Sequence, residues 1–225
     1  MAVRAVPQGV EVRSLSEQVY EHLKAFMNDG RLQPGRFLDL NALADEIGIS
    51  RTPLRDALLR LESEGFVEIL PRRGVRIAEL TLTSIRNIYE ILGALESTAL
   101  QGVADRITPG TVSRMDALNR EMVRALDAFD FGRYYEANLA FHDAYLDLSE
   151  NEELVHRIRI LKQRLYDFPR RKGFVPDWER ASTHEHDELV RLLKEGRVDD
   201  AADFIRDVHW SFPRRSRDRT PVTRR

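Results

Sequence analysis

The sequence predicts a mainly α-helical protein in two parts: a small N-terminal domain with one β-hairpin, and a larger all-helical domain. Three observations predict this division. Apolar residues recur at helical spacing through most of the chain, strand-like patterning is confined to residues 66–78, and the two parts differ in charge. Residues 50–76 carry six basic and four acidic residues, whereas residues 81–210 carry 18 basic and 24 acidic residues. The positive segment indicates an anion-facing surface attached to an acidic body.

Composition excludes several classes of protein. The 225 residues include no cysteine, which rules out disulfide scaffolds, cysteine-type zinc fingers and thiol catalysis. Any metal must therefore bind histidine, carboxylate or amide groups. No apolar run reaches the ~18 residues that a membrane span requires, and no signal-peptide pattern opens the chain. We expect a soluble, cytoplasmic protein.

The N-terminal domain is expected over residues 13–79, after a flexible terminus at residues 1–12. A capping box at Ser14–Glu17 predicts the start of a first helix, because the serine hydroxyl and the glutamate carboxylate can each cap a backbone N–H group. A short second helix is predicted between Asp39, which suits an N-cap, and Gly48, which suits a C-terminal end.

A third helix is predicted within Ser50–Gly65, so close behind the second that the two form a helix-turn-helix. Residues 66–70 and 75–78 then follow strand patterns, and Pro71–Gly74 joins them as a tight turn with a basic tip. Three helices followed by such a hairpin predict a winged helix-turn-helix.

The third helix would present polar residues on the face opposite its leucine stripe. Arginines at the start of such a helix suit bidentate recognition of guanine, and hydroxyl side chains there suit phosphate contacts. Arginines at the hairpin tip suit the minor groove, and a glycine beside them permits a close approach. The residues predicted to contact DNA are Ser50, Arg51, Thr52, Arg55, Arg72, Arg73 and Gly74.

The strings Ile49–Leu58, Leu61–Val67 and Pro71–Val75 resemble those of the GntR family of bacterial transcription regulators. The resemblance covers the whole N-terminal domain. It departs from the family at Asn41, where members often carry an arginine that touches DNA, so operator preference is expected to differ. The resemblance implies DNA contacts by Ser50, Arg51, Thr52, Arg55, Arg73 and Gly74.

The second domain, expected over residues 82–212, shows no strand signal and predicts an all-α antiparallel bundle. A basic tail, residues 213–225, follows it and is expected to be a solvated end. Helices are predicted at about 82–106, 109–129, 131–149, 151–168, 176–196 and 198–212.

Histidines supply the candidate chemistry of the second domain. Asn138 and His142 lie four residues apart on one predicted helix and therefore share a face, but spacing alone does not bring His186 and His209 to them. We interpret His184 as exposed or as a neighbour of the cluster, and His22 and His156 as surface or structural residues.

Residues 83–212 resemble the FCD ligand-binding domain of the FadR-type GntR subfamily, through Asn138-x-x-Phe141-His142, Glu185-His186 and the closing Ala201-Ala202…His209. The resemblance implies a divalent metal, such as zinc or nickel, in an effector pocket. In this chain Asn138 stands where the family has an aspartate, and Leu92 where many members have an arginine for an effector carboxylate. A histidine cluster without metal is the alternative. The implied ligands are Asn138, His142, His186 and His209.

These features predict a DNA-binding transcription regulator, a homodimeric repressor rather than an enzyme. We expect it to bind a near-palindromic double-stranded operator and to respond to a small-molecule effector, an organic acid, at the metal. Two alternatives remain: a metal-dependent hydrolase using the same histidines, and a helical interaction module with a basic tail. The motif around His184–Asp187 is not the HExxH arrangement of zinc proteases, and no phosphate loop or nucleophile elbow occurs.

Overall fold

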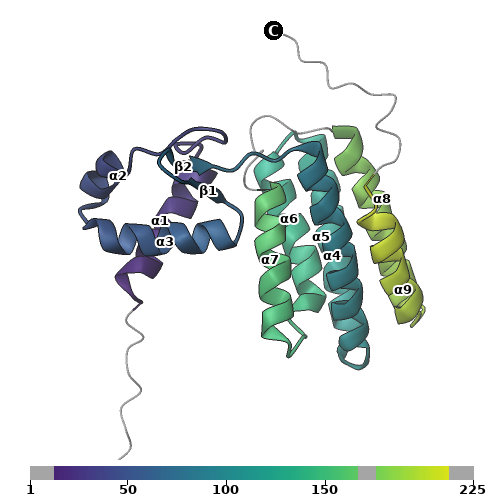
Figure 1. Ribbon diagram of the computed structural model, residues 1–225. Helices are drawn as coiled ribbons and strands as arrows, with labels where there is room; N and C mark the ends of the chain where they lie inside the picture. Colours follow the sequence, from purple (N-terminus) through teal and green to yellow (C-terminus); the bar gives the residue numbers. More distant parts are fainter. Residues whose placement is uncertain (1–12, 167–175, 213–225) are drawn as a thin grey trace, which may run out of the picture. The chain divides into compact units, whose positions relative to one another are not determined.

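The computed structural model describes residues 13–166 and 176–212, and the chain divides into two compact units, residues 1–79 and 80–225 (Figure 1). It is mainly helical, with one two-stranded antiparallel sheet in the N-terminal unit, which confirms the predicted fold class. No helix within the described residues combines the length and apolar character needed to cross a bilayer. The terminus and tail predicted as flexible or solvated lie outside the described residues.

The N-terminal unit contains three helices and a hairpin, in the predicted order. Its elements are α1 (Leu15–Asn28), α2 (Leu40–Ile47), α3 (Arg51–Ser63), β1 (Val67–Leu70) and β2 (Gly74–Ile77). Apolar side chains at helical spacing on α1 and α3 are buried against each other. Gly48 ends α2 in the left-handed region, at φ 75°, where glycine meets no steric penalty.

A polar cluster joins α1 to α3 and corrects the predicted capping box. The Ser14 hydroxyl accepts the Glu17 N–H at 3.2 Å, as predicted, but the Glu17 carboxylate lies 3.3 Å from Arg60 Nη1. Arg60 also reaches Glu64, whose carboxylate accepts the Tyr20 hydroxyl at 2.5 Å. Burial and this carboxylate raise the pKa of Tyr20 above its usual value. Glu17 therefore stabilises the pairing of two helices instead of the end of one.

The second unit is all-helical over its described residues. Its elements are α4 (Leu82–Gly102), a 3₁₀ turn η1 (Ala104–Arg106), α5 (Pro109–Asp127), α6 (Phe131–Leu146), α7 (Glu152–Tyr166), α8 (Pro176–Lys194), α9 (Val198–Phe204) and a π-helical turn η2 (Ile205–His209). Helix α5 packs on α6 and α8, while α4 packs on α7, α9 and η2. One apolar core extends through these helices and includes Leu92.

The last predicted helix differs from the observed one. Instead of one helix over about 198–212, α9 ends at Phe204 and a π-helical turn carries the chain to His209. This turn passes close to Gly93 of α4, where a Cβ atom would lie 3.1 Å from the Arg206 carbonyl oxygen and 3.2 Å from the Trp210 Cβ. Glycine thus lets α4 approach the turn without displacing it. The first helix of this unit also ends earlier than predicted, at Gly102.

We expect Gly93→Val to destabilise the protein by about 1–3 kcal/mol more than Gly102→Val does. Both glycines lie on α4, but a Cβ at Gly102 meets nothing within 4 Å, so this control measures the cost of valine alone. Urea unfolding of both variants measures the difference. Equal losses would show that the close approach at Gly93 contributes nothing to stability.

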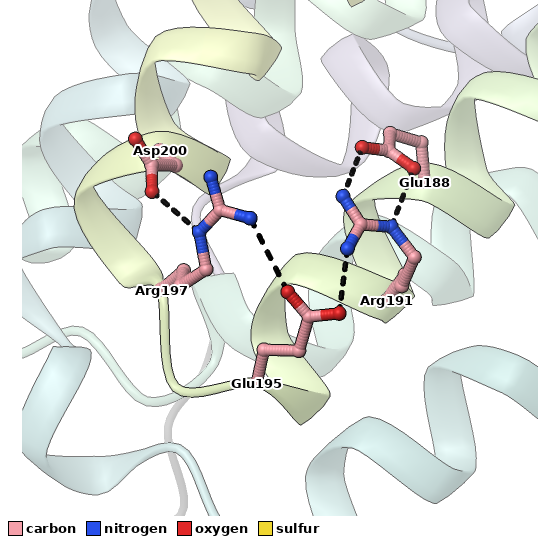
Figure 2. A network of polar contacts seen from close by, with 5 residues as sticks. All are labelled: Glu188, Arg191, Glu195, Arg197 and Asp200. Atoms are coloured by element: carbon pink, nitrogen blue, oxygen red, sulfur yellow. Dashed lines mark hydrogen bonds and ion pairs between the residues drawn. The ribbon is translucent and has the colours of Figure 1, made fainter.

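An exposed ion-pair network crosses the turn between α8 and α9 (Figure 2). Arg191 lies 2.6 Å from Glu188 and 2.5 Å from Glu195, and the other Glu195 oxygen lies 3.3 Å from Arg197. Arg197 in turn lies 2.7 Å from Asp200. Solvent screens such pairs, so the network stabilises the turn only weakly.

Candidate functional site

Helix α3 exposes the polar face predicted to bind DNA. Arg51, Thr52 and Arg55 are exposed, while Leu54 and Leu58 on the opposite face are buried. Ser50 is the N-cap residue and is exposed, and its hydroxyl makes no capping hydrogen bond within the described residues. The start of α3 therefore offers an unused hydroxyl and two guanidinium groups to solvent.

Asn41 contacts one of these arginines across the helix-turn-helix. It is the second residue of α2, and its Oδ1 accepts a hydrogen bond from Arg51 Nη2 at 2.6 Å. A guanidinium has five N–H donors, so Arg51 retains donors for a guanine edge. The residue that departs from the family pattern thus orients a predicted base-reading residue.

The hairpin tip exposes Arg72, Arg73 and Gly74, the predicted wing residues. Gly74 pairs with Leu70 as the last pair of the sheet and has φ 100°, a conformation that side chains rarely adopt. Arg72 also has a positive φ, 62°. The tight tip projects two guanidinium groups from adjacent residues.

In the second unit, three predicted ligand residues lie together. His142 of α6, His186 of α8 and His209 of η2 offer nitrogen atoms that all lie within 4.8 Å of one another. The ring centroids of His142 and His186 are 5.3 Å apart, and each lies about as close to His209, at 5.2 Å and 4.8 Å. We name these three residues the histidine cluster. Its members come from elements far apart in sequence, and packing alone brings them together.

Each histidine of the cluster is held through its Nδ1 atom. His142 Nδ1 lies 2.7 Å from Glu96 Oε2, and His209 Nδ1 lies 2.9 Å from Glu185 Oε2. His186 Nδ1 lies 3.3 Å from the side-chain oxygen of Asn119, whose amide nitrogen donates to Thr183 and Asp187. Since all three partners are oxygen acceptors, each Nδ1 carries the proton and each Nε2 presents a lone pair.

The Nε2 atoms of His142 and His186 are buried and have no hydrogen-bond partner among the residues that the structure describes. Burial lowers the pKa of His142 to about 4 and that of His186 well below its usual value. Both rings are therefore neutral near neutral pH, which is the state that binds a metal ion.

The histidine cluster fits a divalent metal in donor type. Imidazole nitrogens suit zinc, nickel, copper and iron, and held Nδ1 groups are the usual support of such sites. Nitrogens bound to one zinc ion lie about 3.4 Å apart, given Zn–N distances of about 2.1 Å, so the three rings would move together by roughly 1 Å. Asn138 is buried one helical turn before His142 on α6, which suits a fourth, neutral ligand.

Sequence reasoning missed the polar residues that support the cluster. Glu96 lies on the apolar stripe of α4 between Leu92 and Leu100, and Lys162 lies on that of α7. Both are buried, and Lys162 Nζ lies 2.7 Å from Glu96 Oε1. Tyr145 also donates to Glu96. A charged residue on an otherwise apolar helical face is the signal that could have identified both.

Stability of the metal-free protein is expected to fall as the pH drops from about 6.5 towards 4. His142 titrates near 6.5 when unfolded but near 4 when folded, so the unfolded state binds more protons in this window. The loss from His142 alone is roughly 2 kcal/mol at pH 5. Urea unfolding at pH 7 and pH 5, with chelator, measures it.

Two histidine variants isolate this effect. His142→Gln removes the titrating group and should reduce the difference in unfolding free energy between pH 7 and pH 5. His156→Gln replaces an exposed histidine and should leave that difference as it is in the wild type. An unchanged difference in His142→Gln would contradict the assignment.

Together, a winged helix-turn-helix with an exposed basic face and a helical bundle with a buried polar cluster define a DNA-binding transcription regulator with a ligand-binding domain. Residues 15–77 match the family model "Bacterial regulatory proteins, gntR family", and residues 87–208 match the FCD domain. The chain belongs to the GntR family, with an FCD domain of the FadR type.

Known relatives agree with this membership. The Nta operon transcriptional regulator of Aminobacter aminovorans is 29% identical over 178 residues, covering 77% of this chain and 80% of that protein. HTH-type transcriptional regulator McbR of Escherichia coli is 29% identical over 152 residues, covering 68% and 69%. A solved structure of E. coli McbR/YncC matches with a TM-score of 0.65 at 26% identity, over 86% of this chain and 94% of that one.

The family assigns DNA binding to the N-terminal unit and a small-molecule effector to the FCD domain. The family match confirms the prediction that this chain is a transcription regulator. The family and these relatives give no support to the hydrolase alternative, because their names describe regulators.

Proposed function

We propose that this regulator is a homodimeric repressor whose operator binding changes when an organic acid binds at a divalent metal in the FCD domain. Residues 13–79 form the DNA-binding domain and residues 82–212 the domain for effector binding and dimerisation. The exposed guanidinium groups of Arg51 and Arg55 at the start of α3 carry the DNA-binding part of this proposal. The protein acts in the cytoplasm, where the operator is.

On DNA, the start of α3 enters the major groove. Arg51 and Arg55 read guanine edges, while the Ser50 and Thr52 hydroxyls contact phosphates. The wing residues Arg72, Arg73 and Gly74 enter the adjacent minor groove. Two copies place two recognition helices on a near-palindromic site, since dimer symmetry is matched by operator symmetry.

At the effector site, the three histidines and Asn138 hold the metal. The metal would supply a positive charge with open positions for an effector oxygen, and the chain's residues orient the histidines and exclude water. The supporting observation is that Glu96, Asn119 and Glu185 hold the Nδ1 atoms of the cluster, while the buried Nε2 atoms of two of its histidines have no partner in the described part of the chain.

Selection from a random pool of double-stranded DNA tests the proposal. The full-length protein should enrich a near-palindromic sequence, whose half-sites lie about one helical turn apart or a multiple of it. Enrichment of no sequence would contradict the proposal. Enrichment of a single, unrepeated site would contradict the dimer.

A further inference from the structure

Lys162 is a buried cation that, in the part of the chain that the structure describes, touches the histidine cluster only through Glu96. Its side chain on α7 is 3% exposed, and it is the one lysine or arginine among the described residues that is buried. The ammonium lies 2.7 Å from Glu96 Oε1. Burial of a charged group is costly unless every donor is satisfied, so its surroundings should supply acceptors.

Those surroundings supply too few acceptors. An ammonium has three N–H donors, and among the described residues the one acceptor group that lies beside it is the Glu96 carboxylate. Trp210 is 2% exposed, and its indole N–H has no acceptor within residues 13–166 and 176–212. Two buried donor groups are thus short of oxygen acceptors.

Both donor groups lie beside the histidine cluster. Lys162 Nζ lies 5.7 Å from the centre of the Trp210 ring, and that ring lies 5.8 Å from the His142 ring and 5.1 Å from the His209 ring. Lys162 and His142 also share the carboxylate of Glu96. A ligand at the cluster would therefore lie near both side chains.

The local charge also favours an anion. Glu96 and Lys162 form a buried ion pair at 2.7 Å, so their opposite charges cancel. His142 and His186 are neutral, and so is Asn138. A divalent ion held there would add two positive charges, beside which the Glu185 carboxylate on His209 is the one further negative group described, so an anionic ligand would neutralise the remaining charge.

We propose that Lys162 and Trp210 form an anion-binding subsite that holds a carboxylate of the effector beside the histidine cluster. The ammonium supplies the charge, and the indole N–H supplies a directional hydrogen bond. The inference rests on the effector site of the proposed function and adds the residues that recognise the acid. Lys162 attracts anions and repels cations, so its removal should weaken the binding of the acid without weakening the binding of the metal.

Nuclear magnetic resonance of the zinc-loaded, full-length protein titrated with acetate tests the subsite. The chain has two tryptophans, and the indole N–H signal that disappears in Trp210→Phe belongs to Trp210. This signal should shift with acetate and saturate. In Lys162→Met the acetate dissociation constant should rise at least tenfold, while zinc affinity, measured against a competing chelator, should be unchanged or higher.

Lys194→Met is the matched control, because Lys194 is exposed, and both affinities should stay at the wild-type value. If Lys162→Met does not fold, the double variant Glu96→Gln/Lys162→Met removes both buried charges, and its acetate affinity should also fall tenfold. If the wild type binds no zinc, the metal site is wrong, and the same acetate titration of metal-free protein decides the subsite.

Three results would overturn the subsite: a Trp210 signal that acetate leaves unshifted, an acetate affinity that Lys162→Met does not lower, or a parallel loss of zinc and acetate affinity in that variant. Parallel loss would give Lys162 a structural role. None of these results bears on operator selection, which tests the proposed function separately.

Discussion

Replacing Arg51 or Arg55 by alanine is expected to abolish sequence-specific operator binding. Each guanidinium that pairs with a guanine contributes about 1–3 kcal/mol of discrimination, and a dimer loses two such pairs with each substitution. Binding to unrelated DNA should fall much less, because phosphate contacts elsewhere persist. Fluorescence anisotropy with the selected operator and with a scrambled duplex, at one salt concentration, measures the ratio of the specific to the non-specific affinity.

The control for this prediction is Arg114→Ala. Arg114 is an exposed arginine on α5 in the other unit, so the substitution removes the same charge away from the proposed interface. Since Arg51 and Arg55 are also exposed, circular dichroism and unfolding of all three variants should match the wild type. Retained specificity in Arg51→Ala and Arg55→Ala would contradict base reading by α3.

Replacing His186 by alanine is expected to lower metal affinity more than about 100-fold. The ring supplies one of three converging nitrogens, and two remaining histidines hold a metal far less tightly; even loss of a supporting partner typically costs 10–100-fold. Asn119→Ala removes the partner of His186 Nδ1, and its loss of metal affinity should lie within this smaller range of 10–100-fold. Competition with a chromophoric zinc chelator measures both.

His184→Ala is the matched control for the metal prediction, because His184 lies two residues away on the same helix and is exposed. Its zinc affinity should equal that of the wild type. Equal losses in His184→Ala and His186→Ala would show that zinc binds elsewhere, and an unchanged affinity in His186→Ala would contradict the cluster as the site.

Much of the N-terminal unit could be predicted because its signals are local. Each signal is contained in a few consecutive residues. This holds for the helical spacing of apolar residues, the N-cap at Asp39, the end of α2 at Gly48 and the hairpin turn. The capping box was half right, because Arg60, far along the chain, attracts the Glu17 carboxylate. A contact between residues 43 positions apart leaves no trace in a local pattern.

The polar interior of the FCD domain could be predicted only in part. Resemblance to the family identified His142, His186 and His209 as candidate metal ligands. Their spacing in the sequence could not show that they lie together, because the packing of the helices brings them together. Glu96 and Lys162 were missed because each looks like an ordinary member of a helix until α4 and α7 pack. The π-helical turn was missed because it packs against Gly93 of another helix, and such a contact leaves no local pattern.

A DNase I footprint on the selected operator tests the central claim most directly. The wild-type protein should protect two half-sites with centres about one helical turn, or a multiple of it, apart. The variant with both Arg51→Ala and Arg55→Ala should protect neither at the same concentration. Identical footprints from the two proteins, or wild-type protection without defined boundaries, would contradict DNA reading by the exposed face of α3.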